Sequence, residues 1–115
     1  IWRGLDQDNL WVSNSKDGIS WSPQVEIKTS ATTDSPGITH SDSMGVFYAG
    51  WHGLNAPNNP NIFVSASIDG ISYQPQVDTK FQSQNGPALT PAGDGLLMAF
   101  RGQNKDNIFV SNLNS

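Results

Sequence analysis

Trp2-Arg3-Gly4, Trp51-His52-Gly53 and Phe100-Arg101-Gly102 are three copies of an aromatic-basic-glycine motif that begins at positions 2, 51 and 100, at intervals of 49 residues. The similarity continues downstream, where DNLWVS at 8–13 matches PNIFVS at 60–65 and DNIFVS at 106–111, and DGISW at 17–21 matches DGISY at 69–73. A period of this length is typical of stacked or radially arranged repeats. The sequence therefore predicts a single domain over residues 1–115, built from units at about 1–49, 50–98 and 99–115.

The composition favours short strands and argues against several classes of partner. Only 14% of the 115 residues are charged, and a single Glu leaves few helix-forming side chains. The net charge of −4, without any basic cluster, argues against nucleic acid. Since no apolar run reaches the length of a membrane-spanning helix, we expect no membrane insertion. The absence of Cys excludes disulfides and leaves the compartment open, with a secreted or cell-surface location favoured.

Each complete repeat contains four segments with strand character. The expected strands are Gly37–His40 and its counterpart Pro87–Pro91, Val46–Trp51 and its counterpart Leu96–Phe100, Asn61–Ser67, and Ser72–Val77. The second pair is apolar on both faces, which is typical of strands between two sheets. Because Pro75 cannot donate to a ladder, Ser72–Val77 is expected at the outer edge of its sheet. The pattern predicts an all-β fold, a β-propeller of antiparallel four-stranded blades.

Two turns at equivalent places of the repeat resemble a known family. The segments SKDGISW at 15–21 and SIDGISY at 67–73 look like Asp-box (BNR) repeats, the Ser-x-Asp-x-Gly-x-x-Trp hairpins of sialidase-type β-propellers. In such a turn the Asp accepts hydrogen bonds from the turn's backbone, Gly permits a positive φ, and the aromatic fills the space beside the hairpin. The resemblance implies a propeller fold and a structural role for Ser15, Asp17, Gly18, Trp21, Ser67, Asp69, Gly70 and Tyr73.

The residues needed for catalysis are mostly missing. In sialidases, as the resemblance implies, three arginines hold a carboxylated sugar, beside a Tyr nucleophile, its Glu partner and an acid/base Asp. This chain has two arginines, Arg3 and Arg101, both in the repeated motif, and its one Glu, Glu26, is expected on the surface. Neither His40 nor His52 has a companion ligand at metal-binding spacing. We therefore expect no catalytic residue, no metal and no cofactor.

Repetition suits a multivalent sugar-binding surface, because several weak sites raise avidity together. An aromatic ring stacks on a sugar while fixed polar groups bind its hydroxyls. The candidate ligand-binding residues are Trp2, Arg3, Trp51, His52, Phe100 and Arg101, with Asp8, Asn61 and Asp106 from the loops that follow. Since adjacent strand residues point to opposite faces, the aromatic and the base can meet only between neighbouring blades or at a strand end. Alternatively, the aromatics form the core between blades and the bases lie at its rim.

Three functional hypotheses follow. The first is a propeller lectin that binds glycans, similar to the repeat-built lectins of bacteria and fungi. The second is a structural or engineered fragment of an Asp-box propeller without activity of its own. A sialidase-like glycoside hydrolase is the third and least favoured.

The phase of the repeat predicts an assembly. Ile1 aligns with the second strand of a blade, and Ser115 aligns with the start of a third Asp-box, so we expect three, four and three strands in succession. The chain holds about 2.3 repeats, whereas propellers have about four to eight blades. We therefore expect a cyclic homo-oligomer, a dimer or a trimer, whose chains jointly close the ring.

Overall fold

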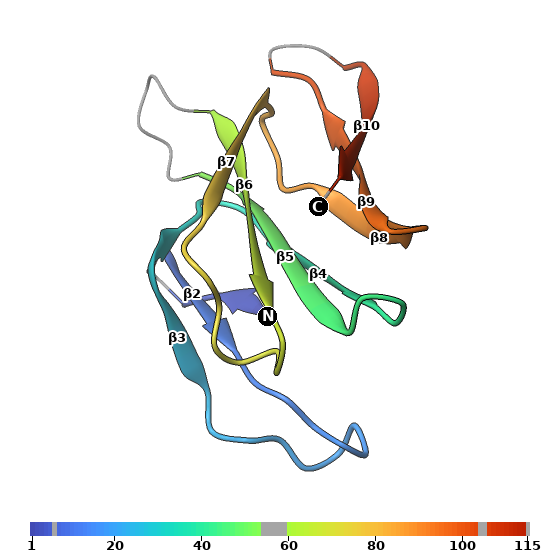
Figure 1. Cartoon of the computed structure of the whole chain (residues 1–115). Coiled ribbons are helices and arrows are strands. Elements are labelled where there is room, and N and C mark those ends of the chain that lie inside the picture. Colours follow the sequence, from blue (N-terminus) through green and yellow to red (C-terminus); the bar gives the residue numbers. More distant parts are fainter. Residues whose placement is uncertain (6, 54–59, 104–105, 115) are drawn as a thin grey trace.

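The computed structural model describes residues 1–5, 7–53, 60–103 and 106–114, and within them the chain is all-β, with ten strands in three antiparallel sheets (Figure 1). The first sheet contains β1 (Trp2–Arg3), β2 (Asn9–Val12) and β3 (Val25–Ala31). The middle sheet contains β4 (Gly37–Ser41), β5 (Val46–His52), β6 (Asn61–Ser67) and β7 (Val77–Gln82). The third contains β8 (Ala88–Ala92), β9 (Gly95–Arg101) and β10 (Ile108–Asn114). The predicted succession of three, four and three strands is confirmed.

Each sheet is a simple meander, in which strands adjacent in the sequence are also adjacent in the sheet. The sheets do not follow the sequence repeat, because the unit at 50–98 begins inside β5 and ends inside β9. A sheet is thus formed by the end of one repeat and the start of the next. Within the described part of the chain the three sheets do not close into a ring.

The last strand of the middle sheet differs from its prediction. It was expected at Ser72–Val77, but β7 runs over Val77–Gln82. The turn at 67–73 uses the N–H groups of Ile71 and Ser72 for its own side-chain hydrogen bonds, and Pro75 has none to donate. Regular pairing with β6 therefore starts only at Val77, which is the partner of Val64. The prediction that this strand lies at the edge of its sheet is confirmed.

The core lies between the sheets, and the middle sheet is covered on both faces. On one face Trp51 and Ala49 pack against Leu10 and Val12 of the first sheet. On the other face Ile62 packs against Met98 and Phe100 of the third sheet. The register explains this alternation: Trp51 is the partner of Phe63, and its neighbour His52, which points to the opposite face, is the partner of Ile62.

The middle and third sheets approach each other most closely at β4 and β8. Strand β4 packs against β8, so the first strands of the middle and third sheets are neighbours. The segments that lead into them also touch: a Cβ added to Gly86 would lie 2.0 Å from the carbonyl oxygen of Ser35. Only glycine fits at this contact, because any side chain would push the two segments apart.

Candidate functional site

The two Asp-containing turns have the same hydrogen bonds. Asp17 Oδ1 accepts from the N–H groups of Ile19 and Ser20, at 2.8 and 2.9 Å. Asp69 Oδ1 accepts equivalent bonds from Ile71 and Ser72, at 2.9 and 2.8 Å. The N–H of Ser20, followed by that of Ile19, lowers the pKa of Asp17. The N–H groups of Ser72 and Ile71 lower the pKa of Asp69 in the same order. All of these bonds lie within the turn, and therefore these carboxylates stabilise the turn's backbone.

Gly18 and Gly70 follow these carboxylates with φ angles of 77° and 79°, the left-handed region that favours glycine. Their N–H groups donate to Ser15 Oγ and Ser67 Oγ, at 2.8 and 2.9 Å. The aromatics that end the two turns differ in environment. Tyr73 packs against the core between the first and middle sheets, whereas Trp21 is mostly exposed.

The first and third copies of the aromatic-basic-glycine motif form the same ion pair. Arg3 Nη2 donates to Asp8 Oδ1 at 2.8 Å, and Arg101 Nη2 donates to Asp106 Oδ1 at 2.8 Å. Each pair joins the end of one strand to the loop before the next strand. The charged groups are exposed or partly exposed, so the four predicted ligand-binding residues are accessible but each is engaged with its neighbour.

The middle copy of the motif is different, because Pro60 stands at the position of Asp8 and Asp106, and His52 at the position of the arginines. His52 is buried, and its Nδ1 lies 3.3 Å from Asp34 Oδ2 in the segment between β3 and β4. In the part of the chain that the structure describes, neither ring nitrogen has a hydrogen-bond partner of good geometry. Both ring nitrogens are shielded from solvent, so this imidazole is a buried polar group whose nearest acid is Asp34.

These groups surround a pocket of about 420 Å³, which is lined by Thr33, Asp34, His52, Pro60, Ser83, Gln84 and Gln103. Its walls therefore include a carboxylate, an imidazole, two hydroxyls and two amides. Such a set contains both donors and acceptors at several angles. It is suited to a small ligand with several hydroxyl groups.

The segments after β3 and β7 place polar residues here by the same local structure. Thr32 N donates to Asp8 O and Ser83 N donates to Pro60 O, so the two residues occupy equivalent positions. Thr32 Oγ1 accepts from the N–H of Asp34, and Ser83 Oγ accepts from the N–H of Asn85, each at 3.1 Å. The turns hold Asp34 and Gln84 at the ends of the outer strands.

Two of the predicted aromatics belong to the core. Trp51 is completely buried between the first and middle sheets. Phe100 stacks between Phe81 and Phe109, with ring centroids 5.5 and 5.9 Å away, between the middle and third sheets. Phe100 also lines a cavity of about 310 Å³ beside Phe81 and Phe109. The burial of Trp51 and Phe100 agrees with the alternative that these aromatics are core residues.

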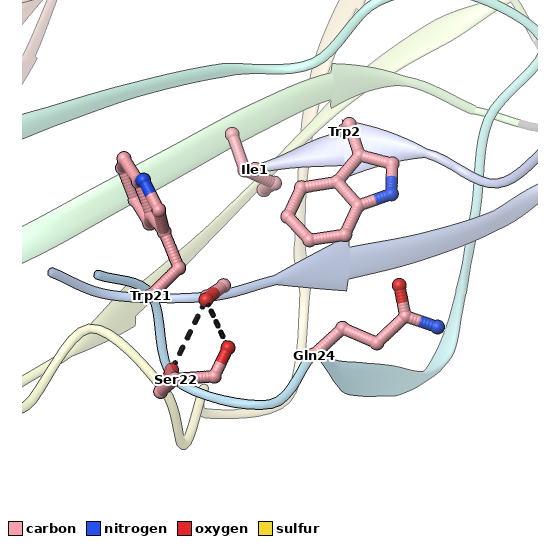
Figure 2. A pocket seen from close by; sticks show the side chains of 6 residues that line it. Ile1, Trp2, Trp21, Ser22 and Gln24 are labelled. Carbon is pink, nitrogen blue, oxygen red and sulfur yellow. Dashed lines mark hydrogen bonds between the residues drawn. The ribbon is translucent and has the colours of Figure 1, made fainter. Parts of the chain in front are cut away.

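The third predicted aromatic, Trp2, lies on the uncovered face of the first sheet. It lines a second pocket of about 520 Å³ together with Ile1, Ser13, Trp21, Ser22 and Gln24. Figure 2 shows the two indoles on either side of this pocket. Ser13 Oγ donates to Ser22 O at 2.6 Å, so this hydroxyl is already bonded. The lining is mainly apolar.

Asn61, the remaining predicted residue, ties β6 to β7. Its Nδ2 lies 3.0 Å from both carboxylate oxygens of Asp78. Asn9 makes the equivalent bond to Glu26 in the first sheet. The pKa of Asp78 is lowered first by the N–H of Lys80 and then by the amide of Asn61. Asn61 thus has a structural partner, and of the predicted residues only His52 lines the polar pocket.

The sequence did not point to the other residues of the polar pocket. Asp34, Ser83, Gln84 and Gln103 lie in connections between strands, outside the matched segments. The segments 32–34 (TTD) and 83–85 (SQN) are equivalent in the repeat, and this similarity could have indicated the site. The two segments align only when the ends of the preceding strands, at Ala31 and Gln82, are known.

Among the described residues, no three His, Cys, Asp or Glu side chains are grouped so that they could bind a metal ion. The same residues include no helix with the length and hydropathy required to cross a bilayer. Neither a protein-family model, nor a curated protein, nor a solved structure matches this chain.

Proposed function

We propose that this protein is a glycan-binding lectin without catalytic activity, with an Asp-box propeller architecture. The observation that carries the proposal is the polar pocket beside His52, where a carboxylate, hydroxyls and amides line one cavity. A sugar offers hydroxyl groups that both donate and accept, so it can bond to Asp34 and the amides at once.

The propeller architecture is supported by the way the sheets pack. Three antiparallel meanders lie face to face, and the first strands of the middle and third sheets are neighbours. Radial packing of this kind places strand ends from adjacent sheets around a common cleft. The pocket fits this arrangement, because Asp34 precedes the middle sheet, His52 lies within it and Gln103 follows β9.

A non-catalytic role is supported by the chemistry of the pocket. Asp34 is the only carboxylic acid among the described residues of its lining, whereas glycoside hydrolysis generally needs two acids on opposite sides of the bond. Arg3 and Arg101 pair with acids of their own loops. Binding by hydrogen bonds is the chemistry that remains.

The test is a glycan array followed by titration calorimetry with the best ligand. His52→Ala should weaken binding about tenfold or more, because it removes part of the pocket wall and the side chain that lies beside Asp34. His40→Ala is the matched control, because His40 also pairs with an acid, Asp42, but lies outside the pocket. Asp34→Asn is a second variant that keeps the shape of the site.

Failure of the chain to bind any glycan on the array would contradict the proposal, as would full affinity in both His52→Ala and Asp34→Asn. Turnover of a fluorogenic sialoside would instead favour a hydrolase. Folding of each variant is checked by its circular dichroism spectrum before titration.

A further inference from the structure

The two outer faces of the stack of sheets are apolar and uncovered. On the first sheet, Trp2 and Trp21 are 38% and 62% exposed. On the third sheet, Ile108 and Val110 are 71% and 63% exposed. Contiguous apolar surface of this kind marks an interaction site more often than a free surface. We call these two surfaces the tryptophan face (Trp2, Trp11, Trp21) and the aliphatic face (Ile108, Val110).

The interface inside the chain shows what fits the tryptophan face. In the middle sheet, the residues equivalent to Trp2 and Trp21 are Trp51 and Tyr73. Both pack against the core cluster that contains Leu10 and Val12 of the first sheet. Leu10 and Val12 correspond in the repeat to Ile108 and Val110. The protein therefore already packs the counterparts of these two faces on each other, within itself.

The strand register supports the equivalence of the faces. Leu10 is the partner of Arg3 in the first sheet, and Ile108 is the partner of Arg101 in the third. Since directly opposed residues point to the same side, Leu10 and Ile108 project from the same side of their sheets. In the same way, Trp2 opposes Trp11, as Trp51 opposes Phe63.

The internal interface also shows how completely these residues become buried. Leu10, Val12 and Trp51 are all nearly inaccessible to solvent. Burial raises the pKa of Tyr73 to about 12, with a further contribution from the Asp69 carboxylate. Ile108, Val110 and Trp2 occupy the equivalent positions of the repeat, but they are exposed or partly exposed.

We propose that a second copy of this chain docks head to tail, with its tryptophan face on the aliphatic face of the first. Both surfaces are present on one chain and they differ from each other, so the contact is heterologous. Each added copy brings one new face of each kind, and association continues until a ring closes. The pocket between Trp2 and Trp21 is then the space that aliphatic side chains of the neighbour fill, as Leu10 and Val12 pack against Trp51.

The experiment measures molar mass by light scattering during size exclusion, at several micromolar concentrations. The unmodified chain should be larger than one copy. Val110→Asp removes the aliphatic face and Trp21→Asp removes the tryptophan face, so each variant alone should be a monomer. Ile68→Asp is the matched control, because Ile68 is 83% exposed at a turn outside both faces, and this variant should assemble like the parent.

Mixing the two monomeric variants gives the sharper result. Val110→Asp keeps its tryptophan face and Trp21→Asp keeps its aliphatic face, so a mixture should form a one-to-one dimer and nothing larger. A symmetric contact between identical faces predicts no such complementation.

Three results would overturn the proposal: a monomeric parent chain at all concentrations, variants that assemble like the parent, or a mixture that stays monomeric. If either variant proves unfolded by circular dichroism, Ile108→Asp or Trp2→Asp takes its place. The mass of the parent chain tests the proposal in any case, because it requires no substitution.

Discussion

Substitution of Trp51 measures how strongly the first and middle sheets hold each other. Its side chain is completely buried against Leu10 and Val12. An aromatic side chain buries about 150–250 Å², which at ~25 cal/mol per Å² is worth about 4–6 kcal/mol. Trp51→Ala should therefore lower the free energy of unfolding by about 3–5 kcal/mol, the usual range for such truncations. This is a large part of the stability of a small domain, about 5–15 kcal/mol.

Trp51→Phe should be far milder, for two opposing reasons. The smaller ring loses contacts worth about 2 kcal/mol, judged from ~0.8 kcal/mol for each buried methylene. However, Trp51 Nε1 is buried without a hydrogen-bond partner among the described residues, and an unsatisfied donor costs about 1–3 kcal/mol. The two effects offset each other, and the net change should stay within about 1 kcal/mol. The protein itself uses Phe100 at the equivalent position.

Both variants are compared by urea denaturation, followed by circular dichroism at one fixed protein concentration, because self-association would add to the measured stability. The fluorescence of Trp51→Phe gives an independent check. Loss of the one fully buried tryptophan of the described residues should shift the mean emission to longer wavelength, since Trp2 and Trp21 are partly exposed. Equal destabilisation by Phe and Ala would refute the argument about the unsatisfied indole, and a stable Trp51→Ala would refute the packing of the sheets.

Four further substitutions test the turns and one ion pair. The pKa of Asp69 is lowered in the folded state, so its contribution to stability is present above the unfolded value of 3.8 and is lost as the pH falls through the folded pKa. Asp69→Asn should therefore lower the urea midpoint at neutral pH. A difference in midpoint between the variant and the parent that does not shrink in acid would contradict this. Gly18→Ala should lower the free energy of unfolding in urea by about 1–2 kcal/mol, because Gly18 has a positive φ. Backbone strain is the whole cost there, since the added Cβ meets nothing within 4 Å. Gly70→Ala should cost more, because its Cβ would also lie 3.2 Å from the ring of Phe47, and equal losses would show that this contact is unimportant. Arg101→Ala should change the free energy of unfolding by less than about 1 kcal/mol, because its pair with Asp106 is solvent-exposed. Calorimetry should still detect glycan binding at the pocket beside His52. Loss of all binding in this variant would contradict the separation of Arg101 from that pocket.

Local features were predictable because they depend on residues that are close in the sequence. The Asp, Gly and Ser of the turns at 15–21 and 67–73 make their hydrogen bonds within each turn, so the motif alone indicates them. The β-branched and aromatic residues of Asn61–Ser67 predicted β6 with its observed bounds. The start of β7 was less predictable, since the turn and Pro75 together delay its pairing with β6.

The site was less predictable because three equivalent positions have different surroundings. Trp2, Trp51 and Phe100 occupy the same place in the repeat, yet Trp51 is buried and Trp2 is partly exposed. The difference arises from the number of sheets stacked against each residue, which no local pattern encodes. The pocket around His52 likewise joins Asp34 and Gln103, which are far apart in the sequence.

The amino-acid sequence by itself thus determined the all-β class, the repeat, most strands and the two Asp turns, since hydrophobic alternation and turn chemistry act over a few residues. Only the tertiary structure decided which faces are covered and which side chains share a pocket. Burial depends on the neighbouring sheet, and the same Leu-x-Val or Ile-x-Val pattern is core at Leu10 and Val12 but surface at Ile108 and Val110. A sheet face becomes core only when another sheet excludes water from it.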